Sequence, residues 1–179
     1  MSSQKSIRKA ADEIKDLLSK EGRGIDVLFN NVGINISQRS LTEEGIELQF
    51  GTNHVGPFLF TNLLLPLLLS PSSSSSASST GKAQKRIVMT SSEAHRISPV
   101  RFSDYNLEPG KKVEKEDEPR RGLPKGVLRG GGAYEPAVAY GQSKTANVLF
   151  AVGLNQRLNK DGVKSFAVMP GSKFYFMLI

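Results

Sequence analysis

The stretch IDVLFNNVG, residues 25–33, decides the fold that this sequence predicts. Residues 25–29 form a short, mostly apolar run, which is typical of a strand buried on both faces of a parallel sheet. The following residues, Asn-Asn-Val-Gly, favour a turn. We therefore expect a buried strand that ends where the polar residues begin.

Two further strands and three helical stretches surround this segment. Residues 86–90 and 163–169 are short apolar runs as well, and the first is followed by two serines and the second by Pro-Gly. Strands that alternate with helices predict a parallel sheet with right-handed crossovers. We expect the three strands to lie in chain order, with helices on both faces. The expected helical stretches are 6–20, a region that begins at Thr42-Glu43-Glu44 and runs to about residue 69, and 136–159.

Composition limits the class of protein. The 179 residues suit one domain, 38% of them are hydrophobic, and the net charge is +7. Such a charge attracts anions, including nucleotide phosphates, but the basic residues are scattered, so nucleic-acid binding is not predicted. Cysteine is absent and the only histidines are His54 and His95, so no metal site is predicted. The most apolar stretch, 57–69, is too short to span a bilayer, and we expect a cytoplasmic protein.

Polar or small residues follow all three predicted strands. In parallel sheets ligands bind at the carboxyl ends of the strands, so these residues predict a site there. The strongest chemical feature is Tyr140-Gly-Gln-Ser-Lys144, in which four-residue spacing on a helix places both side chains on one face. An ammonium beside a phenol favours the phenolate, which can exchange a proton with a carbonyl or alcohol oxygen. Taken alone, the pair could equally be a surface contact.

The ordered set of these features resembles the short-chain dehydrogenase/reductase family, and the run AYGQSKTANVLF (139–150) is most similar to its retinol-dehydrogenase-like branch. The resemblance implies an NAD(P)-dependent oxidoreductase that transfers a hydride between nicotinamide and an alcohol or carbonyl substrate. It implies that Tyr140 is the general acid/base, that Lys144 assists it and binds the nicotinamide ribose, that Ser92 binds the substrate oxygen, and that Asn53 completes a proton relay through a water on Lys144.

The resemblance also implies a cofactor site of NADP or NAD, with NADP slightly favoured. The residue that reads the ribose 2′ position has no counterpart in these 179 residues, so the sequence itself does not choose between the two. The implied cofactor-binding residues are Asn31, Val32, Gly33, Ser91, Tyr140, Lys144, Pro170 and Gly171.

The family pattern is incomplete in this sequence. The Gly-rich turn that follows the family's first strand is absent, and the segment after Gly171 departs from the pattern. We therefore expect residues 1–179 to form a single partial Rossmann domain, a three-layer α/β/α arrangement whose parallel sheet lacks its first strands, truncated at both ends. Loop insertions are expected at about 70–82 and 103–133. The alternative is a catalytically incompetent fragment that associates with other chains, and a homo-oligomer stays open.

Overall fold

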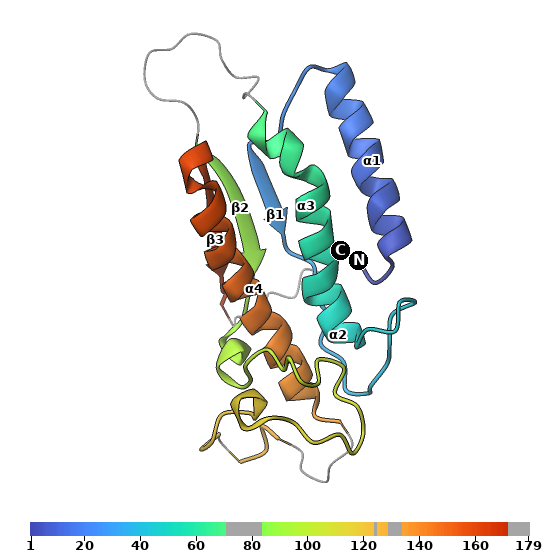
Figure 1. The fold of residues 1–179 in the computed structure, drawn as a ribbon, viewed down its shortest axis with the longest axis vertical. Coiled ribbons are helices and arrows are strands. Elements are labelled where there is room, and N and C mark those ends of the chain that lie inside the picture. Colours follow the sequence, from blue (N-terminus) through green and yellow to red (C-terminus); the bar gives the residue numbers. More distant parts are fainter. Residues whose placement is uncertain (71–83, 124, 129–133, 172–179) are drawn as a thin grey trace.

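Within the described residues the sheet consists of three parallel strands, β1 (Val27–Asn30), β2 (Lys85–Thr90) and β3 (Val163–Val168), in the order β1-β2-β3. The computed structural model describes residues 1–70, 84–123, 125–128 and 134–171 (Figure 1). The expected α/β class, the parallel pairing and the strand order are confirmed. The register pairs Leu28 with Ile87, and Ile87 with Ser165.

In the described residues, four α-helices, one π-helix and three 3₁₀ helices accompany the sheet. A π-helix, η1, joins α2 directly to α3, so the chain winds without interruption across these three elements. The α-helices are α1 (Gln4–Lys20), α2 (Leu48–Phe50), α3 (Gly56–Leu69) and α4 (Pro136–Leu158). The other elements are the π-helix η1 (Gly51–Val55) and the 3₁₀ helices η2 (Glu93–Arg96), η3 (Lys115–Asp117) and η4 (Asn159–Asp161).

The second helical stretch begins later than the sequence predicts. The Thr42 hydroxyl accepts hydrogen bonds from the amides of Glu44 and Ile46, so it stabilises a turn instead of a helix. Gly45 has a φ of 77°, which reverses the chain in that turn. The helix cap is Glu47, whose carboxylate accepts hydrogen bonds from two amides of the first turn. The expected start at residue 42 is therefore wrong by about one and a half turns.

Helices α3 and α4 cover one face of the sheet. The core on this face joins the strands to both helices and includes Leu28, Leu64, Ile87, Met89, Leu154 and Val163. Helix α1 packs beside α3, where Ala11 is fully buried (Figure 1). We expected helices on both faces, but Val27, Phe29 and Phe166 on the second face are 52%, 55% and 43% exposed. Within the described ranges, the arrangement is therefore two layers of a partial α/β fold and not three.

The two expected insertions differ in how much of them is described. Residues 71–83 lie outside the described ranges. The second segment is described apart from residues 124 and 129–133, and it consists of turns with the short helix η3. Among the residues that the structure describes, no helix combines the length and the apolar character needed to cross a membrane.

Candidate functional site

The carboxyl ends of β1 and β2 are joined by polar contacts. The Thr90 hydroxyl, at the end of β2, donates to Oδ1 of Asn31 across 3.2 Å. Asn30 is buried and its amide nitrogen donates to the Thr61 hydroxyl of α3 across 3.0 Å. The turn after β1 is thus fixed against both its neighbouring strand and the helix that covers it.

Tyr140 and Lys144 lie one helical turn apart on α4, and the Lys144 ammonium is 5.3 Å from the centroid of the Tyr140 ring. The Lys144 side chain is 2% exposed, and its Nζ donates to the carbonyl oxygen of Thr90 across 3.0 Å. Burial lowers the pKa of Lys144, because removal from water disfavours the charged form. Lys144 therefore meets the end of β2 at the sheet edge where ligands of parallel sheets bind, with Tyr140 beside it.

Helix α4 and η2, the short helix after the two serines, approach each other closely at Gly141. A Cβ added at Gly141 would lie 2.8 Å from the carbonyl oxygen of Ala94, so only glycine permits this contact. Ser92 caps η2, and its hydroxyl accepts a hydrogen bond from the Ala94 amide. Ser91 is buried, and its hydroxyl donates to the carbonyl oxygen of Lys144 across 3.0 Å. Ser91 thus holds α4, while Ser92 is half-buried at the start of η2.

Asn53 lies in the π-helix η1 and is fully buried. Its side chain accepts a hydrogen bond from the amide of Ile34 and donates to the carbonyl oxygen of the same residue, at 2.7 and 2.9 Å. It also donates to the Ser143 hydroxyl across 3.1 Å. The side chain therefore ties the segment after β1 to α4, and among the described residues its hydrogen bonds go to these two residues and not to Lys144.

Gly33 leaves room beside the lysine ammonium. An added Cβ there would lie 3.2 Å from Lys144 Nζ and 3.5 Å from Asn53 Oδ1. An ammonium has three N–H donors, and within the described ranges Lys144 uses one of them, on Thr90. Spare donors next to an exposed glycine backbone fit the hydroxyls of a cofactor ribose. The neighbouring Asn31 and Val32 are exposed as well.

Pro170 and Gly171 follow β3 at the same edge of the sheet. Both are exposed, and Gly171 has a φ of 93°, a conformation that strongly favours glycine. The residues after Gly171 lie outside the described ranges, so the structure places this side of the site only as far as Gly171.

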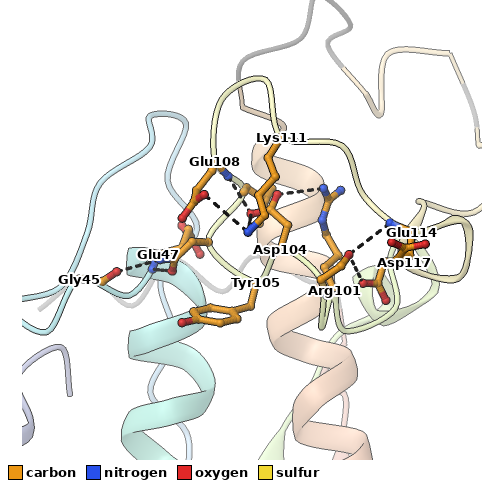
Figure 2. A network of polar contacts seen from close by, with 12 residues as sticks. Gly45, Glu47, Arg101, Asp104, Tyr105, Glu108, Lys111, Glu114 and Asp117 are labelled. Carbon is orange, nitrogen blue, oxygen red and sulfur yellow. Dashed lines mark hydrogen bonds and ion pairs between the residues drawn. The ribbon is translucent and has the colours of Figure 1, made fainter.

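The loop of residues 97–123 is anchored beside the site by a network of polar contacts (Figure 2). Asp104 is buried between the side chains of Arg101 and Lys111, with N···O distances of 3.3 and 4.0 Å. Gln142 of α4, which is fully buried, donates to the carbonyl oxygen of Tyr105 across 2.8 Å. The loop is therefore fastened to the same helical segment that carries Tyr140 and Lys144.

The same loop is joined to the start of α2. The Asn106 side chain accepts from the amide of Glu47 and donates to the carbonyl oxygen of Gly45, at 2.8 and 3.0 Å. Tyr134 donates its hydroxyl proton to the buried Glu47 carboxylate across 2.8 Å, and burial raises the pKa of Tyr134. Loop, α2 and the start of α4 thus form one connected unit around the site.

Two residues at the site were not singled out by the sequence reasoning as functional. Asn147 is 1% exposed and bonds to the carbonyl oxygens of Asn53 and Thr90. His54, which the sequence assigned no role, contacts Asn147 through Nδ1. The signal available was helical spacing, since Asn147 stands three residues after Lys144 and so shares its face. No group of three potential metal-ligating side chains gathers anywhere in the described part of the chain.

Comparisons with a family profile and with curated proteins both identify similar oxidoreductases. The profile of the family described as short chain dehydrogenase matches residues 1–106. The chain is 38% identical over 172 residues to oxidoreductase fscI of Fusarium equiseti, covering 95% of this chain and 62% of that protein. It is 36% identical over 171 residues to human retinol dehydrogenase 13, covering 96% of this chain and 40% of that protein.

A solved structure shares the fold. The NADPH-bound carbonyl reductase from chicken fatty liver superposes with a TM-score of 0.58 at 20% identity, over 95% of this chain and 54% of that one. The chain thus spans between about two fifths and three fifths of the length of these relatives.

Proposed function

Because the chain belongs to the short-chain dehydrogenase/reductase family, we propose that it is an NAD(P)-dependent oxidoreductase that interconverts an alcohol and a carbonyl compound. The observation that carries this proposal is the placement of Lys144, buried and fixed on the Thr90 carbonyl, with its ammonium 5.3 Å from the Tyr140 ring. The relatives named as retinol dehydrogenases favour a lipophilic alcohol or aldehyde among the substrates.

In this proposal Tyr140 moves the proton. In the direction of reduction its hydroxyl gives a proton to the carbonyl oxygen, and in the direction of oxidation its phenolate takes the proton of the alcohol. The ammonium of Lys144 favours the phenolate through its charge. Within the described ranges no protein group hydrogen-bonds the Tyr140 hydroxyl, which leaves it available for a substrate oxygen. Ser92 orients that oxygen with its hydroxyl.

We assign the cofactor to the edge formed by Asn31, Val32, Gly33, Pro170 and Gly171. Ser91 contributes through its hydrogen bond to the backbone of Lys144. A bound nicotinamide supplies or accepts the hydride that accompanies the proton. Lys144 binds the adjacent ribose with the donors that Thr90 does not use. Asn53 orders the segment that carries Gly33, and its participation in a proton relay stays a prediction. The sequence does not distinguish NADP from NAD, and titration with NADPH and NADH in parallel decides between them.

The test of this proposal is the variant Tyr140→Phe in the full 179-residue chain. The change removes the proton donor while it keeps the ring, so we expect the rate of NAD(P)H-dependent carbonyl reduction to fall about 10²–10⁴-fold. The matched control is Tyr105→Phe, because Tyr105 lies on the loop and is 46% exposed. Near wild-type turnover of Tyr140→Phe contradicts the assigned role. Absence of any turnover in the wild type with either cofactor favours the alternative of an incompetent fragment.

A further inference from the structure

Asn147 makes three hydrogen bonds from a nearly completely buried position. Its amide nitrogen lies 3.1 Å from the carbonyl oxygen of Asn53 and 3.1 Å from that of Thr90. Its amide oxygen lies 3.0 Å from Nδ1 of His54. A single side chain of α4 thus connects the π-helix η1 with the end of β2.

The chemistry of these partners fixes the orientation of the amide. Carbonyl oxygens only accept hydrogen bonds, so the NH₂ group of Asn147 must face Asn53 and Thr90. Its oxygen therefore faces His54, and the imidazole must donate from Nδ1–H. His54 packs against the rings of Phe50, Phe58 and Phe150, at centroid distances of 5.4, 6.0 and 6.0 Å. These rings hold the imidazole in place, and with it the Asn147 amide.

The Thr90 carbonyl is the shared element of the arrangement. It accepts a hydrogen bond from Lys144 Nζ at 3.0 Å and one from the Asn147 amide at 3.1 Å. Because both groups bind the same oxygen, a contact that fixes the direction of the Thr90 carbonyl also fixes the position of the Lys144 ammonium. The second partner of Asn147, the carbonyl of Asn53, belongs to the π-helix that holds the segment with Gly33.

We propose that Asn147, oriented by His54, is a positioning residue for the reaction: it holds the Thr90 carbonyl that anchors Lys144 and the Asn53 carbonyl of η1 in one fixed relation. The inference rests on the proposed function, because it gives these anchored groups their task. A displacement of about 1 Å in catalytic groups can cost about 10²-fold in rate, so a residue that touches no substrate can still control turnover.

The experiment compares two leucine substitutions on the same helix. Asn147→Leu keeps the size of the side chain and removes all three hydrogen bonds. The matched control is Asn155→Leu. The Asn155 side chain also joins α4 to a strand backbone, because it accepts from the Ser165 amide and donates to the Ser165 carbonyl oxygen, at 2.8 and 2.6 Å. These bonds lie on β3, away from the site. His54→Phe is a milder second variant that keeps the aromatic packing and loses only the Nδ1–H donor.

Hydrogen–deuterium exchange is the first readout and needs no activity. Asn147→Leu removes two hydrogen bonds to the 51–55 segment, so we predict at least tenfold faster exchange of that segment. Asn155→Leu should accelerate exchange at 163–168 instead and leave 51–55 unchanged. Exchange at 51–55 that is the same in Asn147→Leu as in the wild type overturns the inference.

Steady-state kinetics is the second readout. Asn147→Leu should lower kcat at least tenfold while KM for the carbonyl substrate and for NADPH stays within twofold, and Asn155→Leu should keep kcat within twofold. The kcat of His54→Phe should lie between those of the wild type and of Asn147→Leu. An unchanged kcat in Asn147→Leu shows a purely structural role and overturns the inference. A wild-type chain without turnover contradicts the proposed function, and the exchange measurement then decides the positioning role by itself.

Discussion

The two faces of the three-stranded sheet contrast in what covers them. On one face, Ile87 and Met89 are fully buried under α3 and α4. On the other, Val27, Phe29 and Phe166 stay about half exposed. The helical residues of the proposed proton-transfer site lie on this covered side: Tyr140 and Lys144 on α4, and Asn53 on η1, which continues into α3. The site therefore depends on the packing of one face, and the other face is free of that constraint.

The largest expected difference between the faces is in stability. Ile87→Ala creates a cavity in the core under α3 and α4, and we expect the free energy of unfolding to fall by about 2–5 kcal/mol. Phe29→Ala removes a larger side chain from the exposed face, and we expect a loss below about 1 kcal/mol. Urea unfolding of both variants measures this. Equal losses would show that the second face is covered in solution.

The sequence predicted the covered half of the fold better than the exposed half. The apolar runs identify the strands to within two residues, because a strand buried among others needs apolar side chains at successive positions. The same runs suggest helices on both faces, and this is where the expectation fails. An apolar pattern indicates that a face of the sheet can be buried, but it does not indicate which element covers that face.

The candidate site was predictable to the extent that its residues stand at strand ends or at helical spacing. Tyr140 and Lys144 follow from their four-residue spacing, and Gly33 from the turn after a strand. Helical spacing places Asn147 on the face of Lys144, but it does not reveal the carbonyl oxygens that Asn147 binds, and no spacing points to Glu47; only the folded chain brings these partners together. A side chain that bonds to the backbone of a distant segment has a partner that residue type does not name, so sequence reasoning misses such contacts.

The exposed face also predicts self-association. Its apolar side chains, and the edge of β1 that pairs with no other strand in the described ranges, offer a surface for a second chain. We expect the purified chain to self-associate, and the double variant Phe29→Lys/Phe166→Lys to shift it toward monomer in sedimentation velocity at the same concentration. The comparison variant is Leu149→Lys on α4, which is 52% exposed. If Leu149→Lys disperses the chain and the double variant does not, association uses the helices of the covered side instead.

The smallest expected effect is a pH dependence that originates on the covered side. Burial lowers the pKa of His54, and the hydrogen bond with Asn147 opposes this only in part. Below about pH 6.5 the unfolded chain therefore binds a proton that the folded chain still excludes. The free energy of unfolding should fall with decreasing pH in this range, by at most about 1.4 kcal/mol per pH unit for one group. Urea unfolding at pH 7.5 and 5.5 measures the fall.

His54→Phe should remove this part of the pH dependence, because the variant has no group at that position that can take up a proton. The carboxylates of Glu44 and Asp117 do not interfere in this range. Hydrogen bonds lower the pKa of both in the folded chain, so their contribution to stability changes only as the pH approaches the ordinary carboxyl pKa of about 4. An equal fall in the wild type and in His54→Phe between pH 7.5 and 5.5 would show that the imidazole is protonated in the folded chain as readily as in the unfolded one. The neutral Nδ1–H donor to Asn147 would then not be the form that the packing on the covered side selects.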